Sequence, residues 1–335
     1  MRFSKEETEM EKMKKTEKSR WSFAGLYMRY GMFLILIVLA IAASIISPAF
    51  LSVINITNII KYISIVAIVA FGETLILILG EIDLSLGSVM ALAGCVCCRL
   101  IVSTGSLVTG LLGGILIGVL CGAVNGAVIS IFHIPSFIIT LATMKIARGA
   151  VLLFTNAVPV SGMGEAFGFI GQGYIFGRVP MTVIVMAAVF IITWIILNRH
   201  RFGRHIYACG GNKQAARASG IKTGKTVTIT YIIMGVLSAV AGIVLMSYMN
   251  SGQPAGADGY EMDAITAAIV GGTSFTGGIG TIQGTFVGCL IVGILDNVMN
   301  LMSVSSYWQQ IVRGIIIALA VIMDVVSKSA IKGKE

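Results

Sequence analysis

The chain has 335 residues and a formal net charge of +9; 56% of its residues are hydrophobic and only 12% are charged. Soluble domains carry about 25% charged residues, so a composition with a mean hydropathy of +0.94 excludes a water-solvated globular fold. The composition predicts a polytopic membrane protein.

Long apolar runs follow one another along the chain. A hydrocarbon core of about 30 Å is crossed by about 20 apolar residues in a helix. The predicted fold is therefore all-α, a polytopic transmembrane helical bundle of about ten helices. The predicted spans are 31–48, 56–80, 87–103, 106–132, 136–154, 180–197, 226–249, 262–276, 280–301 and 307–326.

Two of these spans have an unusual character. The run 56–80 reads either as one long helix or as one broken helix, and the run 262–276 is short and polar. Irregular backbone within a membrane is tolerated where protein or an aqueous cavity surrounds it. Each of the two runs is therefore a candidate re-entrant segment.

Basic residues gather in three places, where they predict the cytoplasmic side. The tail 1–30 carries eight Lys and Arg, the loop 198–225 carries seven with no acid, and the tail 327–335 carries three. An even number of spans then separates these segments, with residues 31–326 as the membrane domain and both termini cytoplasmic. The positive charge faces an anionic lipid surface and does not indicate a nucleic-acid partner.

Three motifs suggest ligand chemistry, but their settings argue against it. The run "CVCC" (95–98) lies in an apolar helix with no nearby histidine, so packing is favoured over a metal site. "GIKTGKT" (220–226) and "GIGTIQG" (278–284) imitate nucleotide-binding loops, yet neither follows a strand. No metal and no cofactor is therefore predicted in this chain, and any ATP must be hydrolysed by another one.

Glycine is abundant, with 40 residues, and many lie four apart in "GGILIGVLCGAVNGAV" (113–128). Small residues at this spacing let membrane helices approach backbone to backbone. Most of these glycines are therefore predicted to serve helix packing.

The stretch "GEIDLSLGSV" (80–89) interrupts two apolar runs with two carboxylates. An acid at the centre of a membrane helix costs about 2.5–3.5 kcal/mol, and each Leu returns only about 0.3–0.6 kcal/mol. A helix break with Glu81, Asp83, Ser85 and Ser88 facing a protein-lined aqueous cavity is far cheaper. Capping of the next helix by Asp83 or Ser85 is the alternative.

A second interruption, "GGTSFTGGIG" (271–280), lies about 190 residues after the first. Transporter folds often place such breaks in two corresponding halves of the chain. The spacing therefore predicts broken helices and an internal duplication.

At these residues the sequence resembles the membrane permeases of bacterial ABC importers for ribose, galactose, xylose and similar monosaccharides, and the ribose permeases most. The resemblance lies in "GEIDLSLGSVMALAG", "IPSFIITLATMKIARG", "NRHRFGRHIYACGGNKQAARASGI", "GYEMDAITAAIVGGTSFTGGIGTIQGTFVG" and "SSYWQQIVRGIIIALAVIMD". The family usually has Gly-Gly-Ile-Asp where this chain has "GEID" (80–83). Glu81 is therefore a local feature of this chain.

The resemblance implies a non-enzymatic permease in the bacterial cytoplasmic membrane with three kinds of protein partner. These are a second permease copy, an ABC ATPase on the cytoplasmic face and an extracytoplasmic sugar-binding protein. The loop 198–225 then holds the coupling segment, in which Asn212 caps a helix that presents a low-relief surface; its alternative is a mere cytoplasmic anchor. The implied coupling residues are Gly211, Asn212, Ala215, Ala216 and Gly220.

A neutral sugar needs hydrogen-bonding side chains along its path in place of water. Each candidate could equally make a hydrogen bond between helices. The pathway candidates are Asp83, Ser85, Asn125, Asp296, Asn297 and Asn300. Arg148 and Asp296 lie at similar depths, roughly 20 and 24 Å above the starts of their helices, which predicts that they pair.

On the outer face the segments 155–179 and 250–263 are the longest exposed pieces. Asp258, Glu261 and Asp263 are predicted to meet the binding protein, with solvated connectors as the alternative. The competing function is a self-sufficient secondary carrier or channel that uses intramembrane acids. Ribose-like pentoses are the first choice of substrate, ahead of hexoses, polyols and furanosyl signals.

Overall fold

The computed structural model of the protein describes residues 23–332, so most of the predicted tail 1–30 and the last three residues of the tail 327–335 lie outside the described residues. Ten helices correspond one to one to the predicted spans. They are α2 (Phe23–Ile46), α3 (Val53–Ile78), α4 (Leu86–Thr104), α5 (Leu107–Phe132), α6 (Ser136–Thr155), α8 (Met181–Asn198), α11 (Thr223–Tyr248), α12 (Tyr260–Val270), α13 (Ile282–Leu301) and α14 (Ser306–Lys332).

Shorter elements join these helices. The 3-10 helix η1 (Pro48–Leu51) precedes α3, and α7 (Glu165–Gln172) is followed by an antiparallel hairpin of β1 (Tyr174–Ile175) and β2 (Val179–Pro180). The predicted loop 198–225 contains two helices, α9 (Arg201–Gly211) and α10 (Lys213–Ala218). The bundle is otherwise helical over the described range, which confirms the predicted fold class.

Eight of the helices are long and apolar enough to cross a membrane. This count covers only the described residues, which include the apolar stretch Gly31–Ile46 of α2. One predicted span falls short: α12 has 11 residues. At 1.5 Å per residue α12 extends only about 16 Å, about half of the hydrocarbon core. The run 56–80 forms one continuous helix, α3, so a break within it is not observed.

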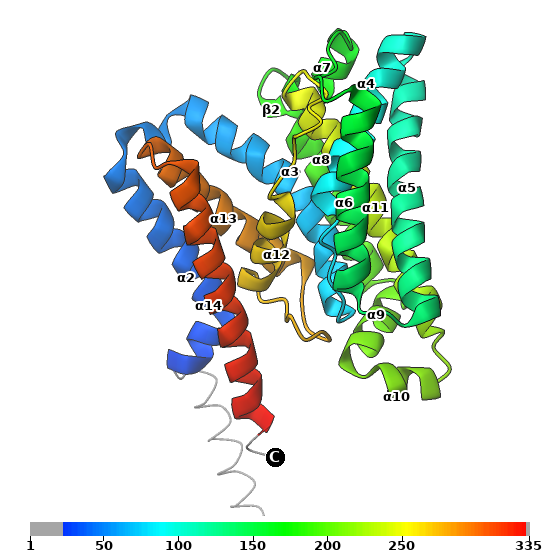
Figure 1. The fold of residues 1–335 in the computed structure, drawn as a ribbon. Helices are drawn as coiled ribbons and strands as arrows, with labels where there is room; N and C mark the ends of the chain where they lie inside the picture. The colour runs from blue at the N-terminus through cyan, green and yellow to red at the C-terminus, as the bar shows by residue number, and fades with distance from the viewer. Residues whose placement is uncertain (1–22, 333–335) are drawn as a thin grey trace, which may run out of the picture.

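The centre of the bundle is formed by α3 and α11. In the most apolar segment of each helix, 89% of the residues of α3 and 72% of those of α11 are buried. The corresponding shares are 17% in α6 and 6% in α14. Figure 1 shows α3 crossing between a group made of α2, α13 and α14 and a group made of α4, α5, α6 and α11. The outer helices thus expose apolar faces, as a membrane requires.

Glycines of α5 line its contact with the neighbouring helices. A Cβ atom added at Gly118 would lie 2.2 Å from the carbonyl oxygen of Gly235 in α11, and one at Gly122 would meet Tyr231 equally closely. Only residues without a side chain permit this approach. The predicted packing role of these glycines is confirmed.

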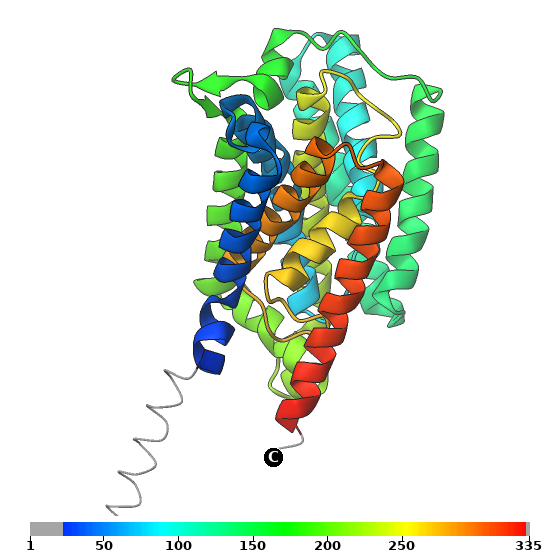
Figure 2. The same ribbon diagram turned by 90° about the vertical axis from the view of Figure 1, so that its left-hand side faces the viewer.

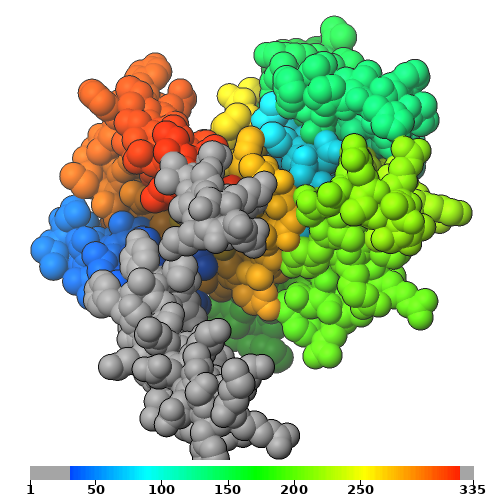
Figure 3. Space-filling model, turned by 90° about the horizontal axis from the view of Figure 1, so that it is seen from below, coloured from blue at the N-terminus to red at the C-terminus, as the bar shows by residue number. Residues whose placement is uncertain are grey.

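The ends of the chain lie on one side of the molecule. Figures 1 and 2 place the start of α2, the end of α14 and both α9 and α10 at the same end of the bundle, with α7 and the hairpin at the other. Within the described residues, the parts of the chain next to the three basic segments therefore lie at one end of the bundle. Seen from that end, residues 200–222 form a projecting surface, yellow-green in Figure 3.

Candidate functional site

The first helix break lies between α3 and α4. Gly80 has a φ of +81°, which turns the chain out of α3, and Asp83 then accepts hydrogen bonds at Oδ1 from Ser85 N (2.8 Å) and Ser85 Oγ (2.6 Å). The break is confirmed. Ser85 is the N-cap residue of α4 but its side chain makes no capping hydrogen bond, so Asp83 holds the turn before α4 and does not cap the helix itself.

Protein groups rather than a cavity enclose this break. Asn125 Nδ2 donates to Ser85 Oγ at 3.1 Å, Thr143 Oγ1 donates to Asn125 Oδ1, and Asp83 N donates to Glu73 Oε1 at 3.2 Å. Asp83 is 3% exposed, and Ser85 and Asn125 are 1% exposed. The predicted water-lined setting of Asp83 is thus wrong, and the three predicted pathway residues form one internal network.

The second break lies between α12 and α13 and touches the first. Gly277 and Gly278 have φ values of +85° and +78°, and Gly278 N donates to the carbonyl oxygen of Ile78 at 2.8 Å. Thr281 then caps α13 by accepting from Gly284 N at 3.0 Å. Both interruptions consist of a helix, a glycine turn and a second helix, and only the second helix of the later break has a side-chain cap. The shared order supports the predicted duplication.

The end of α9 lies against both breaks. A Cβ atom added at Gly210 would lie 1.7 Å from the Ile78 carbonyl oxygen and 2.8 Å from Gly278 N. Tyr207 Oη donates to the carbonyl oxygen of Gly280 at 2.7 Å, and Lys213 Nζ pairs with Glu81 Oε1 at 3.0 Å. The segment predicted to couple to an ATPase thus meets both broken helices.

Most of the predicted coupling residues are exposed on this segment. Asn212 Oδ1 accepts from Ala215 N at 2.9 Å, which confirms that Asn212 caps α10. Asn212, Ala215, Gly211 and Gly220 are exposed. Ala216 is the exception: it is 4% exposed and packs into the core, so it does not form part of the presented surface.

A polar cavity of about 230 Å³ lies on the other side of the bundle centre, between α3, α11, α13 and α14. It brings together three of the predicted pathway residues, Asp296, Asn297 and Asn300. Four more polar side chains, which the sequence analysis did not select, also line it: Asn58, Tyr62, Tyr248 and Arg313. The volume is below the range of about 300–1,000 Å³ that drug-sized ligands occupy, which suits a small solute.

Charged groups beside this cavity are paired. Arg313 contacts Asp296 at 2.9 Å and Asp263 at 3.2 Å, and Tyr62 Oη lies 3.0 Å and 2.9 Å from the same two carboxylates. Asn297 exchanges amide hydrogen bonds of 2.8 and 3.0 Å with Asn55. Paired in this way, charges can remain within a membrane domain.

The predicted pair of Arg148 with Asp296 is wrong. Arg148 Nη1 donates to the carbonyl oxygens of Pro254 and Gly256, at 2.8 and 2.9 Å, and Asp296 binds Arg313 instead. Equal depth did not bring the two residues together because α6 packs on α4 and α5, not on α13. Arg148 holds the outer connector between α11 and α12.

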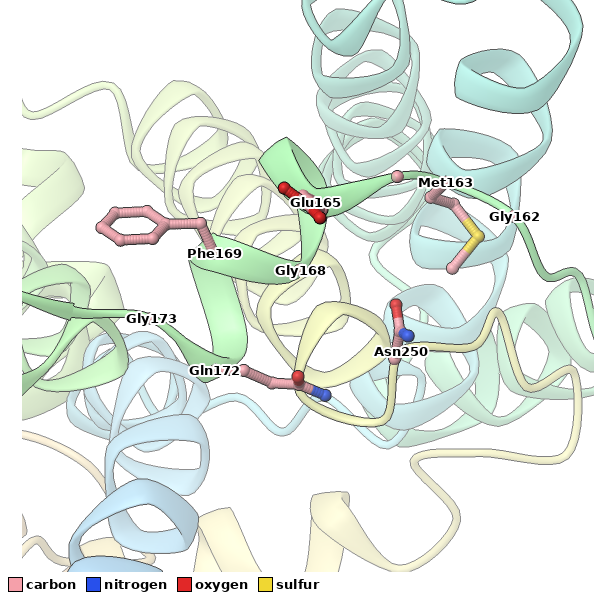
Figure 4. A pocket seen from close by; sticks show the side chains of 9 residues that line it. Gly162, Met163, Glu165, Gly168, Phe169, Gln172, Gly173 and Asn250 are labelled. Atoms are coloured by element: carbon pink, nitrogen blue, oxygen red, sulfur yellow. The ribbon is translucent and has the colours of Figure 1, made fainter.

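The two outer segments named in the sequence analysis meet each other. Val160 and Gly252 exchange backbone hydrogen bonds of 3.0 and 2.8 Å. A cavity of about 510 Å³ lies at this contact. Its polar lining residues are Glu165, Gln172 and Asn250, and glycines, Met163 and Phe169 form the rest of the lining. Figure 4 shows this cavity between α7 and the turn that follows α11.

The three acids predicted for docking have different positions. Asp258 is exposed on the outer connector. Glu261 is 8% exposed and Asp263 is 2% exposed, and both begin α12 inside the bundle. A surface role for Glu261 and Asp263 is therefore excluded, and the charge balance with Arg313 accounts for Asp263.

Comparison with known proteins places the chain in a transport family. Residues 55–321 match the family described as "Branched-chain amino acid transport system / permease component". The chain belongs to this family. The permease is thus a multi-pass membrane protein of a transport system, as its eight long apolar helices also indicate.

Curated relatives cover most of the permease. The "Ribose import permease protein RbsC" of Bacillus subtilis (strain 168) is 45% identical over 76% of this chain and 80% of its own length. The RbsC of Escherichia coli (strain K12) is 40% identical over the same shares. The "L-arabinose transport system permease protein AraH" of that strain is 41% identical over 92% and 93%. No solved structure matches the permease significantly.

Sequence reasoning missed the partners of the cavity acids. Arg313 lies within an apolar run that was predicted to span the membrane, and a cation in that position is itself a functional signal. Tyr62 carried no such signal, because it precedes Asp296 by 234 residues and tyrosine is common in membrane helices. Only the tertiary contact identifies it.

Proposed function

We propose that the permease is the membrane-spanning subunit of an ATP-driven importer for a monosaccharide, with a ribose-like pentose as the first choice. The observation that carries the proposal is the polar cavity. Its amide, carboxylate, guanidinium and phenol groups can exchange hydrogen bonds with sugar hydroxyls in place of water. Similarity to proteins named for ribose and arabinose transport supports the same class of solute.

The solute path in this proposal passes Asp296, Asn297 and Asn300. Asn58 lines the same cavity and is exposed, and its side chain makes no hydrogen bond with residues 31–324. Its amide is therefore free to contact a solute. Asp83, Ser85 and Asn125 act at a distance in this scheme, because their network fixes the first helix break.

The ATPase in this proposal docks on α10 at the end of the molecule shown in Figure 3. Gly211, Asn212, Ala215 and Gly220 supply a surface of low relief, and a neighbouring cavity of about 480 Å³ is lined by Arg201, Lys222 and Lys225 among others. Cations without acids in this segment favour an acidic rim on the ATPase.

The opposite end in this proposal receives the extracytoplasmic binding protein. The cavity drawn in Figure 4 joins both outer segments, and its Glu165, Gln172 and Asn250 side chains, with Asp258 nearby on the connector, offer polar contacts. The chain itself catalyses no reaction in this scheme. A second copy completes the pathway, and the bilayer covers the remaining apolar faces, with both termini cytoplasmic.

The test uses proteoliposomes that contain the permease with a candidate ATPase and a binding protein. Uptake of labelled ribose that needs ATP and both partners is the expected result. Uptake by the permease alone, driven by an ion gradient, would establish the competing carrier instead. If neither kind of uptake is observed with ribose, arabinose or a polyol, the proposal is wrong.

A cavity variant tests the solute path. Asn58→Leu keeps the side-chain size but removes the hydrogen-bonding amide, so we expect lower uptake at unchanged thermal stability. Asn58→Gln, which retains the amide, is the matched control and should keep most of the uptake. Equal uptake by both variants would show that the solute does not contact this side chain.

A further inference from the structure

The segment α9–α10 contacts each broken helix through a separate side chain. Tyr207 Oη donates to Gly280 O at 2.7 Å, at the end of the second break. Lys213, the first residue of α10, pairs with Glu81 in the first break at 3.0 Å. Burial raises the pKa of Tyr207, so its hydroxyl stays protonated and remains a donor.

Between these two contacts the backbones touch directly. Gly210 lies so close to Ile78 and Gly278 that no Cβ atom fits between them. The hydrogen bond from Gly278 N to Ile78 O, 2.8 Å long, joins the two breaks to each other. Backbones packed directly against each other leave little room for deformation. The end of α9 and the two helix breaks therefore move together.

The ion pair differs from the rest of this joint in its exposure. The Lys213 side chain is 53% exposed and that of Glu81 is 12% exposed. Ion pairs as exposed as this one add little to stability, so stability does not explain the pair. The ion pair lies at the capped start of α10, beside the surface that the proposed ATPase covers. It can separate and re-form with a small change in free energy.

The short helix α12 connects the second break to the charged groups beside the polar cavity. The helix α12 begins near Asp263, which pairs with Arg313 at 3.2 Å, and ends at the break held by Tyr207. Its 11 residues extend about 16 Å as a single helix. A displacement of the joint therefore reaches the charged groups beside the cavity.

We propose that Lys213 and Tyr207 are positioning residues that couple ATPase movement to both broken helices, with Glu81 as the partner through which Lys213 acts. The inference rests on the proposed function and adds to it the route from the ATPase to the cavity.

The experiment measures solute molecules transported per ATP hydrolysed in proteoliposomes that contain the complete transporter. Lys213→Gln, Glu81→Gln and Tyr207→Phe should each lower this ratio by about fivefold or more. ATP hydrolysis itself should persist, and the ATPase should still copurify with each variant. The exchanged pair, Glu81→Lys with Lys213→Glu, should recover most of the ratio.

Arg99→Gln is the control, because Arg99 is an exposed cation in α4, outside the segments assigned to either partner, with no ion pair among the described residues. It should leave the ratio unchanged. Parental ratios in all three single variants, or loss of ATPase copurification in Lys213→Gln, would overturn the coupling role. Failure of the parent to import any sugar would instead remove the proposed function, so the two failures are distinct.

Discussion

Arg313 is the residue on which the charge balance of the cavity depends. Its guanidinium contacts Asp296 at 2.9 Å and Asp263 at 3.2 Å, both inside the bundle. Removing one partner of a buried ion pair costs about 3–5 kcal/mol, because the remaining charge stays buried without compensation. Arg313→Gln should therefore lower the thermal unfolding midpoint of the detergent-purified permease and abolish uptake.

Two further variants separate charge from geometry at this position. Arg313→Lys keeps the charge but lacks the planar fork that contacts two carboxylates, so its midpoint should fall between those of the parent and Arg313→Gln. Arg178→Gln, at an exposed cation in the β1–β2 hairpin, should match the parent. A midpoint for Arg313→Gln as high as that of Arg178→Gln would contradict the charge-balance argument.

The sequence allowed single residues to be placed only where local chemistry determined their role. The cap formed by Asn212 and the grouping of Asp296 with Asn297 follow from neighbouring residues in one helix, and both were predicted. The contact of Asp296 with Tyr62 and Arg313 depends on which helices are neighbours. Depth along a helix axis does not contain that information, so the pair of Arg148 with Asp296 was predicted wrongly.

At the scale of elements, the contact between α5 and α11 depends on absent side chains. A Cβ atom at Gly118 would lie 2.2 Å from Gly235 O, so Gly118→Ala must push the two helices apart. Overpacking of this kind costs about 1–3 kcal/mol. The thermal midpoint of Gly118→Ala should therefore fall clearly below that of the parent.

Gly149→Ala in α6 is the control for this prediction, since a Cβ atom there meets nothing within 4 Å. Alanine is favoured over glycine inside a helix by about 1 kcal/mol, so this variant should be neutral or slightly more stable. Equal destabilisation by both substitutions would indicate a loss of chain flexibility rather than a steric clash.

Hydropathy located all ten principal helices because each apolar run had to be long enough to be buried or to face lipid. It did not find α9 or α10, because charged and small residues give no apolar signal. The helix α10, capped by Asn212, was expected only from the family resemblance. Hydropathy also placed the end of the second break correctly. It extended the predicted span to residue 276, however, whereas α12 ends at Val270. Glycine turns decide that boundary.

At the scale of the whole molecule, the two ends of the bundle differ in charge. The end with α9 and α10 carries the basic segment 198–225, which contains seven Lys and Arg and no acid. The opposite end carries charges of both signs, among them Glu165, Asp258 and Arg178. Basic segments are retained on the cytoplasmic side of a membrane. The proposed orientation therefore places α10 inside the cell and the β1–β2 hairpin outside.

Single cysteines at the two ends test this orientation. Phe176 is 95% exposed in the hairpin and Arg217 is exposed on α10, so a membrane-impermeant thiol reagent can reach either position once it has access to that side. The native cysteines contribute little labelling: Cys209 is buried in α9, and burial raises its pKa, which keeps it a weakly reactive thiol. In intact cells Phe176→Cys should be labelled and Arg217→Cys should not. Permeabilised cells should label both, whereas labelling of Arg217→Cys alone in intact cells would reverse the orientation and, with it, the side on which an ATPase can dock.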